Sequence, residues 1–138
     1  MVLLDDKLLR SVLADATTIA IVGAKDKAGQ PVDRVGRYLI EAGYEVIPVH
    51  PKRTNVWGLE TYVQLGAIPK PVDVVDVFRA PEYCVDHAKE AVNLAMKPRL
   101  FWLQSGIVCP GAMELVQGAG IMGVQDRCLM VEHGRLFQ

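Results

Sequence analysis

The sequence lacks most of the residue patterns from which metal, disulfide and nucleic-acid proteins are built. It has three cysteines, an odd number without C-x-x-C spacing, which argues against a disulfide framework and against a cysteine zinc site. The three histidines show neither H-x-x-H nor H-E-x-x-H spacing, so we expect no metal site. The formal net charge is −1, so no basic field favours DNA or RNA as a partner.

Long apolar runs are also absent. No stretch approaches the ~20 residues that a membrane-spanning helix needs, so we expect no membrane partner. Residues 1–16 carry acids early and show no basic segment followed by a long apolar run, so we predict no signal peptide. Together with the cysteine pattern, these observations favour a reducing, cytoplasmic setting.

The residues that are present suit one folded domain, which we expect to span 1–138. The chain has 138 residues, of which 51% are apolar and 22% charged, enough to fill a core without a bias toward disorder. Apolar, β-branched runs predict five strands, at 17–22, 44–49, 72–78, 99–103 and 120–124. Helices are predicted at 4–15, 34–42, 81–96 and 110–118, with a short helical turn at 61–65 and a turn and helix in 126–137. Asp33 is the expected N-cap of the second helix, and Gly43 its expected stop.

The strands are almost continuously apolar, which is typical of strands buried on both faces of a parallel sheet. We therefore predict an α/β fold, a single doubly wound Rossmann-like domain with a mainly parallel five-stranded sheet. Ligands of such folds bind at the carboxyl ends of the strands. The segments that leave those ends are 23–32, 50–53, 78–81 and 104–109.

The first of these segments begins Gly23-Ala24-Lys25, directly after an apolar strand. A glycine here lets the backbone approach a ligand, and free N–H groups of the loop and of the next helix can hold phosphate. The loop lacks the G-x-G-x-x-G fingerprint of NAD sites and is longer than that fingerprint allows. The alternative is a tight turn without a ligand.

The second segment reads His50-Pro51-Lys52-Arg53. An NAD site carries an acidic residue at this point, which binds the ribose hydroxyls. The cations Lys52 and Arg53 instead suit a ribose that bears a phosphate, as NADP does at the 2′ position and coenzyme A at the 3′ position. A solvated basic turn is the alternative.

The third and fourth strands are also followed by candidate binding residues. Phe78 and Pro81 can flank an adenine or a pantetheine, and Arg79 can meet a pyrophosphate through a bidentate contact. Gly106 permits close approach of a ligand, while Gln104 and Ser105 supply hydrogen-bond donors.

No catalytic residue is predicted. A serine nucleophile at Ser105 is disfavoured, because the G-x-S-x-G elbow is absent and no histidine has an obvious partner. Among the cysteines, Cys109 is expected closest to the ligand, and Cys128 is interpreted as a buried thiol. Nothing in the sequence assigns a redox role to either of them or to Cys84.

Five segments together resemble the small stand-alone CoA-binding domain family, which is related to the N-terminal Rossmann-like domain of the succinyl-CoA synthetase α subunit. They cover nearly the whole chain in the family's order: IAIVGA at 19–24, RYLIEAGYEVIPVHPK at 37–52, PVDVVDVFRAPE at 71–82, LFWLQSGI at 100–107 and DRCLMVEHGRLF at 126–137.

The resemblance implies that coenzyme A lies across the strand ends. Gly23, Ala24 and Lys25 would then cradle a phosphate, and Lys52 would meet another. On the same basis the adenine or the pantetheine would be bordered on one side by Phe78, Arg79 and Pro81, and on the other by Gln104, Ser105 and Gly106. Lys25 departs from the pattern, since many relatives have Ser or Thr there. The synthetase relatives perform acyl-phosphate chemistry with a histidine in a second domain that this sequence lacks, so ligase activity does not carry over.

The sequence therefore predicts a stand-alone module that binds coenzyme A or an acyl-CoA in a non-catalytic or accessory role. Two alternatives remain open at this stage. One is an NADP-linked oxidoreductase, which the basic end of the second strand permits. The other is a regulatory interaction protein that has kept the fold and lost the ligand. The sequence does not fix the oligomeric state, and a homodimer stays open.

Overall fold

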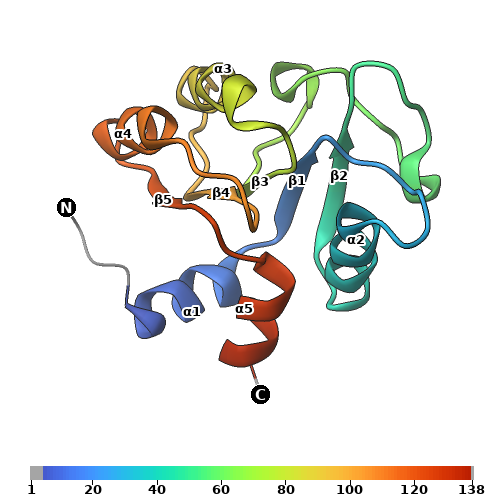
Figure 1. The fold of residues 1–138 in the computed structure, drawn as a ribbon, viewed down its shortest axis with the longest axis horizontal. Helices are drawn as coiled ribbons and strands as arrows, with labels where there is room; N and C mark the ends of the chain where they lie inside the picture. The colour runs from blue at the N-terminus through green and yellow to red at the C-terminus, as the bar shows by residue number, and fades with distance from the viewer. Residues whose placement is uncertain (1–4, 138) are drawn as a thin grey trace.

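A computed structural model describes residues 5–137 and places a parallel five-stranded sheet between two layers of helices (Figure 1). The strands are β1 (Thr18–Val22), β2 (Glu45–Val49), β3 (Val74–Val77), β4 (Leu100–Leu103) and β5 (Met122–Val124), in the spatial order β2-β1-β3-β4-β5. All four neighbouring pairs are parallel. The predicted α/β Rossmann-like fold is confirmed.

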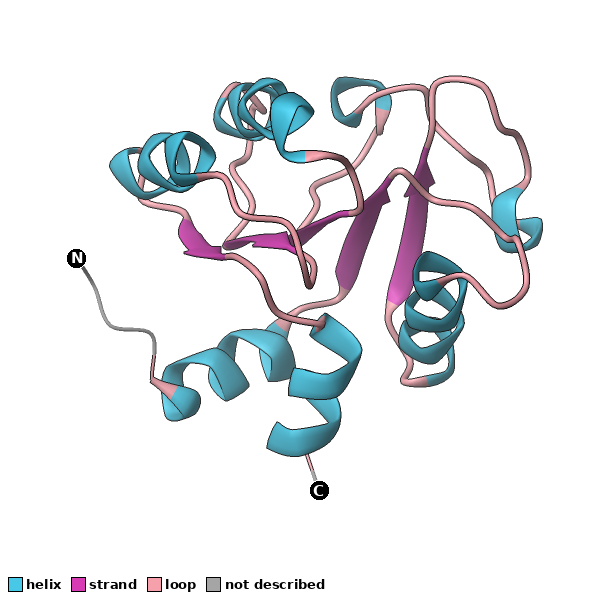
Figure 2. Cartoon of the chain, viewed as in Figure 1, coloured by secondary structure: helices cyan, strands magenta, loops and turns pink. Residues whose placement is uncertain are grey.

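The helices divide between the two faces of the sheet (Figure 2). They are α1 (Asp6–Asp15), α2 (Pro31–Glu41), α3 (Pro81–Val92), α4 (Pro110–Gly118) and α5 (Leu129–Leu136). One core lies between the sheet and α3 and α4, and the other between the sheet and α1, α2 and α5. β1, β3 and β4 contribute to both cores and are buried along their whole length, which explains their nearly continuous apolar sequences.

The start of α2 differs from the sequence-based prediction. Asp33 is not its N-cap: the helix begins at Pro31, and Gln30 is the N-cap. Proline suits the first helical position because its fixed φ is already helical and its missing N–H would have no intrahelical partner. Asp33 lies in the first turn instead, where it accepts hydrogen bonds from Arg37 Nε and Trp57 Nε1 at 3.0 and 2.8 Å.

Two other boundaries also need correction. The segment 61–65 is not a helical turn, because Tyr62 extends the edge of the sheet through an isolated bridge to Val49. The short 3₁₀ turns of this connection lie on either side, at Val56–Gly58 and Leu65–Ala67. The helix α3 ends at Val92 rather than near residue 96. The predicted stop of α2 at Gly43 agrees with its positive φ of 100°.

The connection from β2 to β3 is fastened to α2 by Trp57. This residue has a left-handed backbone, with φ at 55°, and its indole lies over Gly36. A Cβ atom at Gly36 would lie only 2.2 Å from Trp57 Cζ2, so the contact depends on a glycine. The indole N–H donates to Asp33, which holds the ring in place. Trp57 therefore anchors segment 50–60 to the helix.

No helix within residues 5–137 has the length and apolar content to cross a membrane.

Candidate functional site

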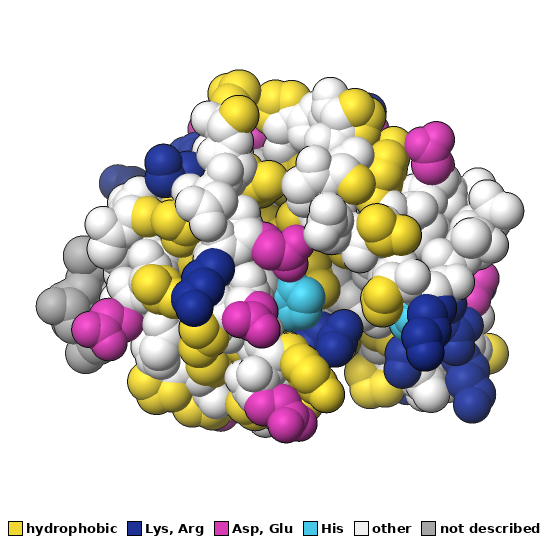
Figure 3. Space-filling view, turned by 90° about the horizontal axis from the view of Figure 1, so that it is seen from above, with side chains coloured by type: hydrophobic (Ala, Val, Ile, Leu, Met, Phe, Trp, Pro, Cys, Tyr) yellow, Lys and Arg dark blue, Asp and Glu magenta, His cyan; other side chains and the backbone are white. Residues whose placement is uncertain are grey.

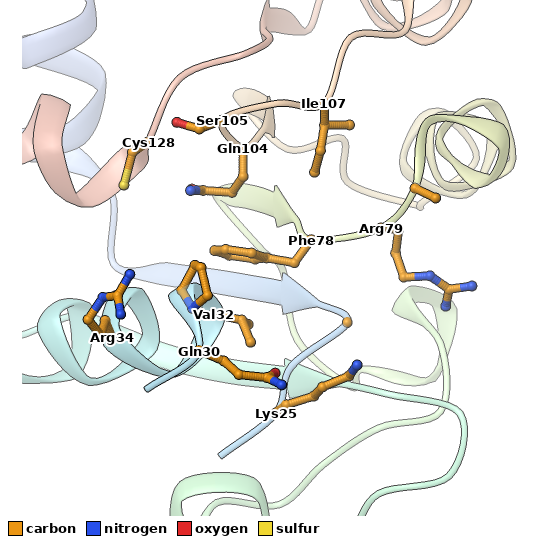
Figure 4. A pocket seen from close by; sticks show the side chains of 13 residues that line it. Lys25, Gln30, Val32, Arg34, Phe78, Arg79, Gln104, Ser105, Ile107 and Cys128 are labelled. Carbon is orange, nitrogen blue, oxygen red and sulfur yellow. The ribbon is translucent and has the colours of Figure 1, made fainter. Parts of the chain in front are cut away.

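A pocket of about 530 Å³ opens at the carboxyl ends of β1, β3 and β4 (Figure 4). This is where a doubly wound sheet binds ligands, since the chain leaves β1 toward β2 on one side and returns to β3 on the other. Its wall comes from the loop after β1, the start of α2, the ends of β3 and β4, and the start of α5. The residues are Gly23, Lys25, Gln30, Pro31, Val32, Arg34, Phe78, Arg79, Ala80, Gln104, Ser105, Ile107 and Cys128.

Gly23 shapes the floor of the pocket where β1 ends. Its φ is 83°, and a Cβ atom there would lie 2.4 Å from the carbonyl oxygen of Phe78. The amides of Gly23 and Ala24 donate to the Val49 carbonyl at 2.9 and 3.2 Å. They extend the β1–β2 pairing and are not free phosphate donors. An anion in the pocket therefore depends on later groups of the loop and on side chains.

One side of the pocket is cationic. Lys25 and Arg79 line it, and both lie close enough to His50 to lower the pKa of its imidazole. Burial is the largest cause of that lowering, followed by the charges of Arg53, Lys25, Arg79 and Lys52. His50 Nδ1 accepts hydrogen bonds from the amides of Lys52 and Arg53, each at 3.0 Å, which requires an unprotonated Nδ1. We call Lys25, Lys52, Arg53 and Arg79 together the basic rim.

Lys and Arg side chains gather at one corner of the face shown in Figure 3, which looks down on the molecule from above the view of Figure 1. The charge of the basic rim is only partly neutralised. Among the residues that the structure describes, one of its four cations forms an ion pair, namely Arg53 with Asp26 at 3.6 Å. Arg79 is held by stacking, with its guanidinium carbon 4.4 Å from the centre of the Tyr83 ring. A ligand with several phosphate charges suits this rim.

The opposite side of the pocket is polar and less basic. Gln104 is only 4% exposed, and its Oε1 accepts a hydrogen bond from the Leu129 amide at 3.1 Å. Cys128 is the half-buried N-cap residue of α5. Figure 4 shows the Gln104 side-chain nitrogen directed toward the side on which Cys128 and Ser105 lie, away from Lys25 and Arg79. Phe78 lies between the two sides.

The structure brings six of the eleven predicted site residues into this one pocket: Gly23, Lys25, Phe78, Arg79, Gln104 and Ser105. Lys52 and Arg53 do not line it but belong to the basic rim. The other three lie outside the wall. Ala24 is fully buried in the core, Pro81 opens α3, and Gly106 forms a turn that is held by a 2.7 Å hydrogen bond from its amide to Asp126.

The sequence-based prediction did not include seven residues of the wall: Gln30, Pro31, Val32, Arg34, Ala80, Ile107 and Cys128. The first four belong to the start of α2, and proline at the first helical position was the available signal for it. The structure exchanges the positions expected for Cys109 and Cys128 relative to the ligand. Cys109 is buried, at 8% exposed, and does not line the pocket, whereas Cys128 does.

No group of three or more potential ligands that could hold a metal ion occurs between residues 5 and 137. Burial raises the pKa of the Cys84 thiol to about 11, so this side chain is protonated at neutral pH. The pocket presents the cations Lys25 and Arg79 on one side. The other side presents an amide, a hydroxyl and a thiol, together with the cation Arg34.

Comparison with known proteins gives consistent matches. The family described as "CoA binding domain" matches residues 17–134. The chain is 31% identical to the uncharacterized protein YneT of Bacillus subtilis over 125 residues, 91% of each chain. The structure of cell-free ID.343 from Thermus thermophilus is 45% identical, with a TM-score of 0.91 over 97% of this chain and 100% of that one. A hypothetical protein from Pyrococcus horikoshii is 33% identical, with a TM-score of 0.93 over 98% and 94%.

Proposed function

Because the chain belongs to the CoA-binding domain family, we propose that it binds coenzyme A or an acyl-CoA in the pocket at the strand ends, without a catalytic step of its own. The observation that carries this proposal is the asymmetry of the pocket. Its basic rim comprises Lys25, Lys52, Arg53 and Arg79. The far side offers a single cation, Arg34, beside the neutral polar groups of Gln104, Ser105 and Cys128. Coenzyme A has the matching asymmetry, with its phosphates at one end and a long neutral arm at the other.

The charges of the rim support a phosphorylated ribose in particular. Lys52 and Arg53 follow the end of β2, which is the edge strand beside β1. Dinucleotide sites place an acidic residue near this point to bind the ribose hydroxyls, and a phosphate on the ribose calls for cations instead. The pocket volume of about 530 Å³ lies within the usual range for cofactor sites. The cytoplasmic setting stays a prediction from the sequence.

Thermal unfolding with added ligand tests this proposal first. Coenzyme A at a hundred times its dissociation constant should stabilise the folded chain by about 2.7 kcal/mol, because it binds only the folded state. The expected result is a concentration-dependent rise in melting temperature with coenzyme A or acetyl-CoA that NADP⁺ does not match. A selective response to NADP⁺ would favour the oxidoreductase alternative. No response to any of these ligands would favour an interaction protein that has lost the ligand.

A charge-removing double substitution tests the assignment of the ribose phosphate. Replacement of Lys52 and Arg53 by alanine should weaken coenzyme A binding roughly 10-fold, since one or two charge-assisted contacts to the phosphate are lost. Dephospho-CoA lacks that phosphate, so its affinity should change little. Isothermal titration calorimetry gives both affinities.

The matched control removes two lysine charges elsewhere. Lys89 and Lys97 are exposed and do not line the pocket, so their replacement by alanine should leave both affinities almost unchanged. Equal losses for coenzyme A and dephospho-CoA in the Lys52 and Arg53 variant would contradict the assignment of the 3′-phosphate. Equal losses in both double variants would show that net charge alone controls binding.

A further inference from the structure

Gln104 is a buried polar side chain whose orientation the fold determines. The Leu129 amide can donate only to an oxygen, so the side-chain oxygen of Gln104 must be the atom that faces it, at 3.1 Å. The side-chain nitrogen then faces the pocket, as Figure 4 shows. The residue is only 4% exposed, yet this nitrogen donates to no acceptor within residues 5–137.

The nitrogen is open to the pocket, because the buried side-chain atoms without a partner within residues 5–137 are the two carboxyl oxygens of Asp76. A ligand that fills the pocket takes the place of solvent at this nitrogen and should offer it an acceptor. The surroundings narrow the chemistry of that acceptor. Phe78 and Ile107 are apolar, and Ser105 and Cys128 are neutral. Arg34 is the single cation of the pocket on the Cys128 side; its Nη1 donates to the Gly29 carbonyl at 2.9 Å, and the guanidinium keeps its charge. Lys25 and Arg79, which suit phosphate, lie on the opposite side.

We propose that the Gln104 side-chain nitrogen donates to a neutral carbonyl oxygen in the arm of the ligand, and so directs that arm along Phe78 toward Cys128 and Ser105. This inference rests on the proposed function and deepens it by assigning the direction in which the ligand lies. Two groups share the required chemistry, namely an amide carbonyl of pantetheine and the thioester carbonyl of an acyl-CoA. Gln104 is therefore a residue that recognises the arm, whereas the basic rim recognises the phosphates.

The test is Gln104→Glu, which keeps the oxygen that accepts from Leu129 and replaces the donor by an acceptor. Three ligands are compared by calorimetry: coenzyme A, acetyl-CoA, and 3′-phospho-ADP, which is the head of coenzyme A without its arm. The variant should bind coenzyme A about 10-fold more weakly, as expected for the loss of one buried hydrogen bond. Its affinity for 3′-phospho-ADP should change less than about 3-fold.

The control for the added charge is Gln125→Glu. Gln125 Oε1 likewise accepts from a backbone amide, that of Cys109 at 2.9 Å, but the residue does not line the pocket. None of the three ligands should lose more than about 3-fold in affinity for this variant. Hydrogen exchange at the Leu129 amide checks that the Gln104 variant keeps its fold.

The outcomes separate the two proposals. A larger loss in Gln104→Glu for acetyl-CoA than for coenzyme A supports the thioester carbonyl, and equal losses for these two support an amide carbonyl. If the wild type binds all three ligands and the variant weakens coenzyme A and 3′-phospho-ADP equally, or weakens neither, this inference is overturned while the proposed function stands. If the wild type binds none of them, both proposals are overturned.

Discussion

Substitution of Gly23 by alanine should lower the free energy of unfolding by about 2–5 kcal/mol, combining a left-handed backbone penalty with overpacking. The φ of Gly23 is 83°, and a Cβ atom would lie 2.4 Å from the Phe78 carbonyl oxygen. The obstacle is backbone, and Phe78 cannot retreat freely because its amide donates to the Val22 carbonyl at 2.9 Å. The β1–β3 contact beneath the pocket must therefore open. Urea unfolding measures the loss.

Gly29→Ala is the matched control for that substitution. Gly29 lies in the same loop with almost the same φ, 88°, but a Cβ atom there meets nothing within 4 Å. It should cost only the backbone penalty, about 1–2 kcal/mol. The difference between the two variants isolates the close approach of β1 to the end of β3. If Gly23→Ala costs no more than Gly29→Ala, the packing at this crossing is not tight.

The second large effect concerns Asp76, which lies in the middle of β3. Its neighbours across the sheet are Ile21 and Trp102, both in the core shared with α1, α2 and α5. The side chain is completely buried, and neither carboxyl oxygen has a hydrogen-bond partner within residues 5–137. Burial raises the pKa of this carboxyl well above 3.8. The buried carboxyl is thus a cost that the rest of the core offsets.

We expect Asp76→Leu, which has the same branching of heavy atoms, to raise the free energy of unfolding at pH 8 by about 1–4 kcal/mol, as found when buried charges give way to apolar groups. The pH dependence has a definite sign. The carboxyl of Asp76 has a higher pKa in the folded state than in the unfolded state, so its ionisation destabilises the fold. The stability that goes with the protonated carboxyl is fully present below the unfolded pKa of 3.8. It is lost as pH rises through the folded value. The advantage of the leucine variant should therefore be smallest near pH 4.

Asp76→Asn provides the control, since it keeps the shape and polarity of the protonated carboxyl and cannot ionise. The pKa of His50 and the pKa of His133 are both lowered, which gives stability that is lost as pH falls below about 6.5. These groups act in the opposite direction but are common to all variants, so differences taken at each pH remove them. If the wild type and the asparagine variant change stability in parallel from pH 4 to pH 8, Asp76 does not titrate as argued.

The sequence predicts the layers of this fold well, because burial on both faces leaves a direct mark on β1, β3 and β4. Boundaries set by tertiary contacts were harder. Asp33 has the side chain of an N-cap, but its carboxylate is used by Trp57, a residue 24 positions away. The 61–65 segment looked helical from its composition, yet Tyr62 extends the edge of the sheet beside β2. Neither partner can be read from local spacing.

The candidate site likewise contains residues that the sequence predicts and residues whose position depends on long-range contacts. Residues that directly follow a strand, such as Phe78 and Gln104, were found because parallel strands end at one edge of the sheet. Cys128 was missed as a pocket residue because it enters through the start of α5, whose approach to Gln104 is a long-range contact. The hydrogen bonds from the Gly23 and Ala24 amides to the Val49 carbonyl are also long-range contacts, so local sequence does not predict them. Sequence spacing shows where a donor is, but not whether another strand already uses it.

The contact of the Trp57 indole with Gly36 affects how the basic rim would bind a ligand. Segment 50–60 is held at one end by the hydrogen bonds of His50, along its length by the indole on α2, and beyond it by the pairing of Tyr62 with Val49. A loop that is already fixed has little conformational entropy left to lose when an anion arrives. Attraction between the rim and a phosphate is then available for affinity instead of being spent on ordering the chain. Gly36, a small residue buried between α2 and the Trp57 indole, thus contributes to recognition without touching the ligand.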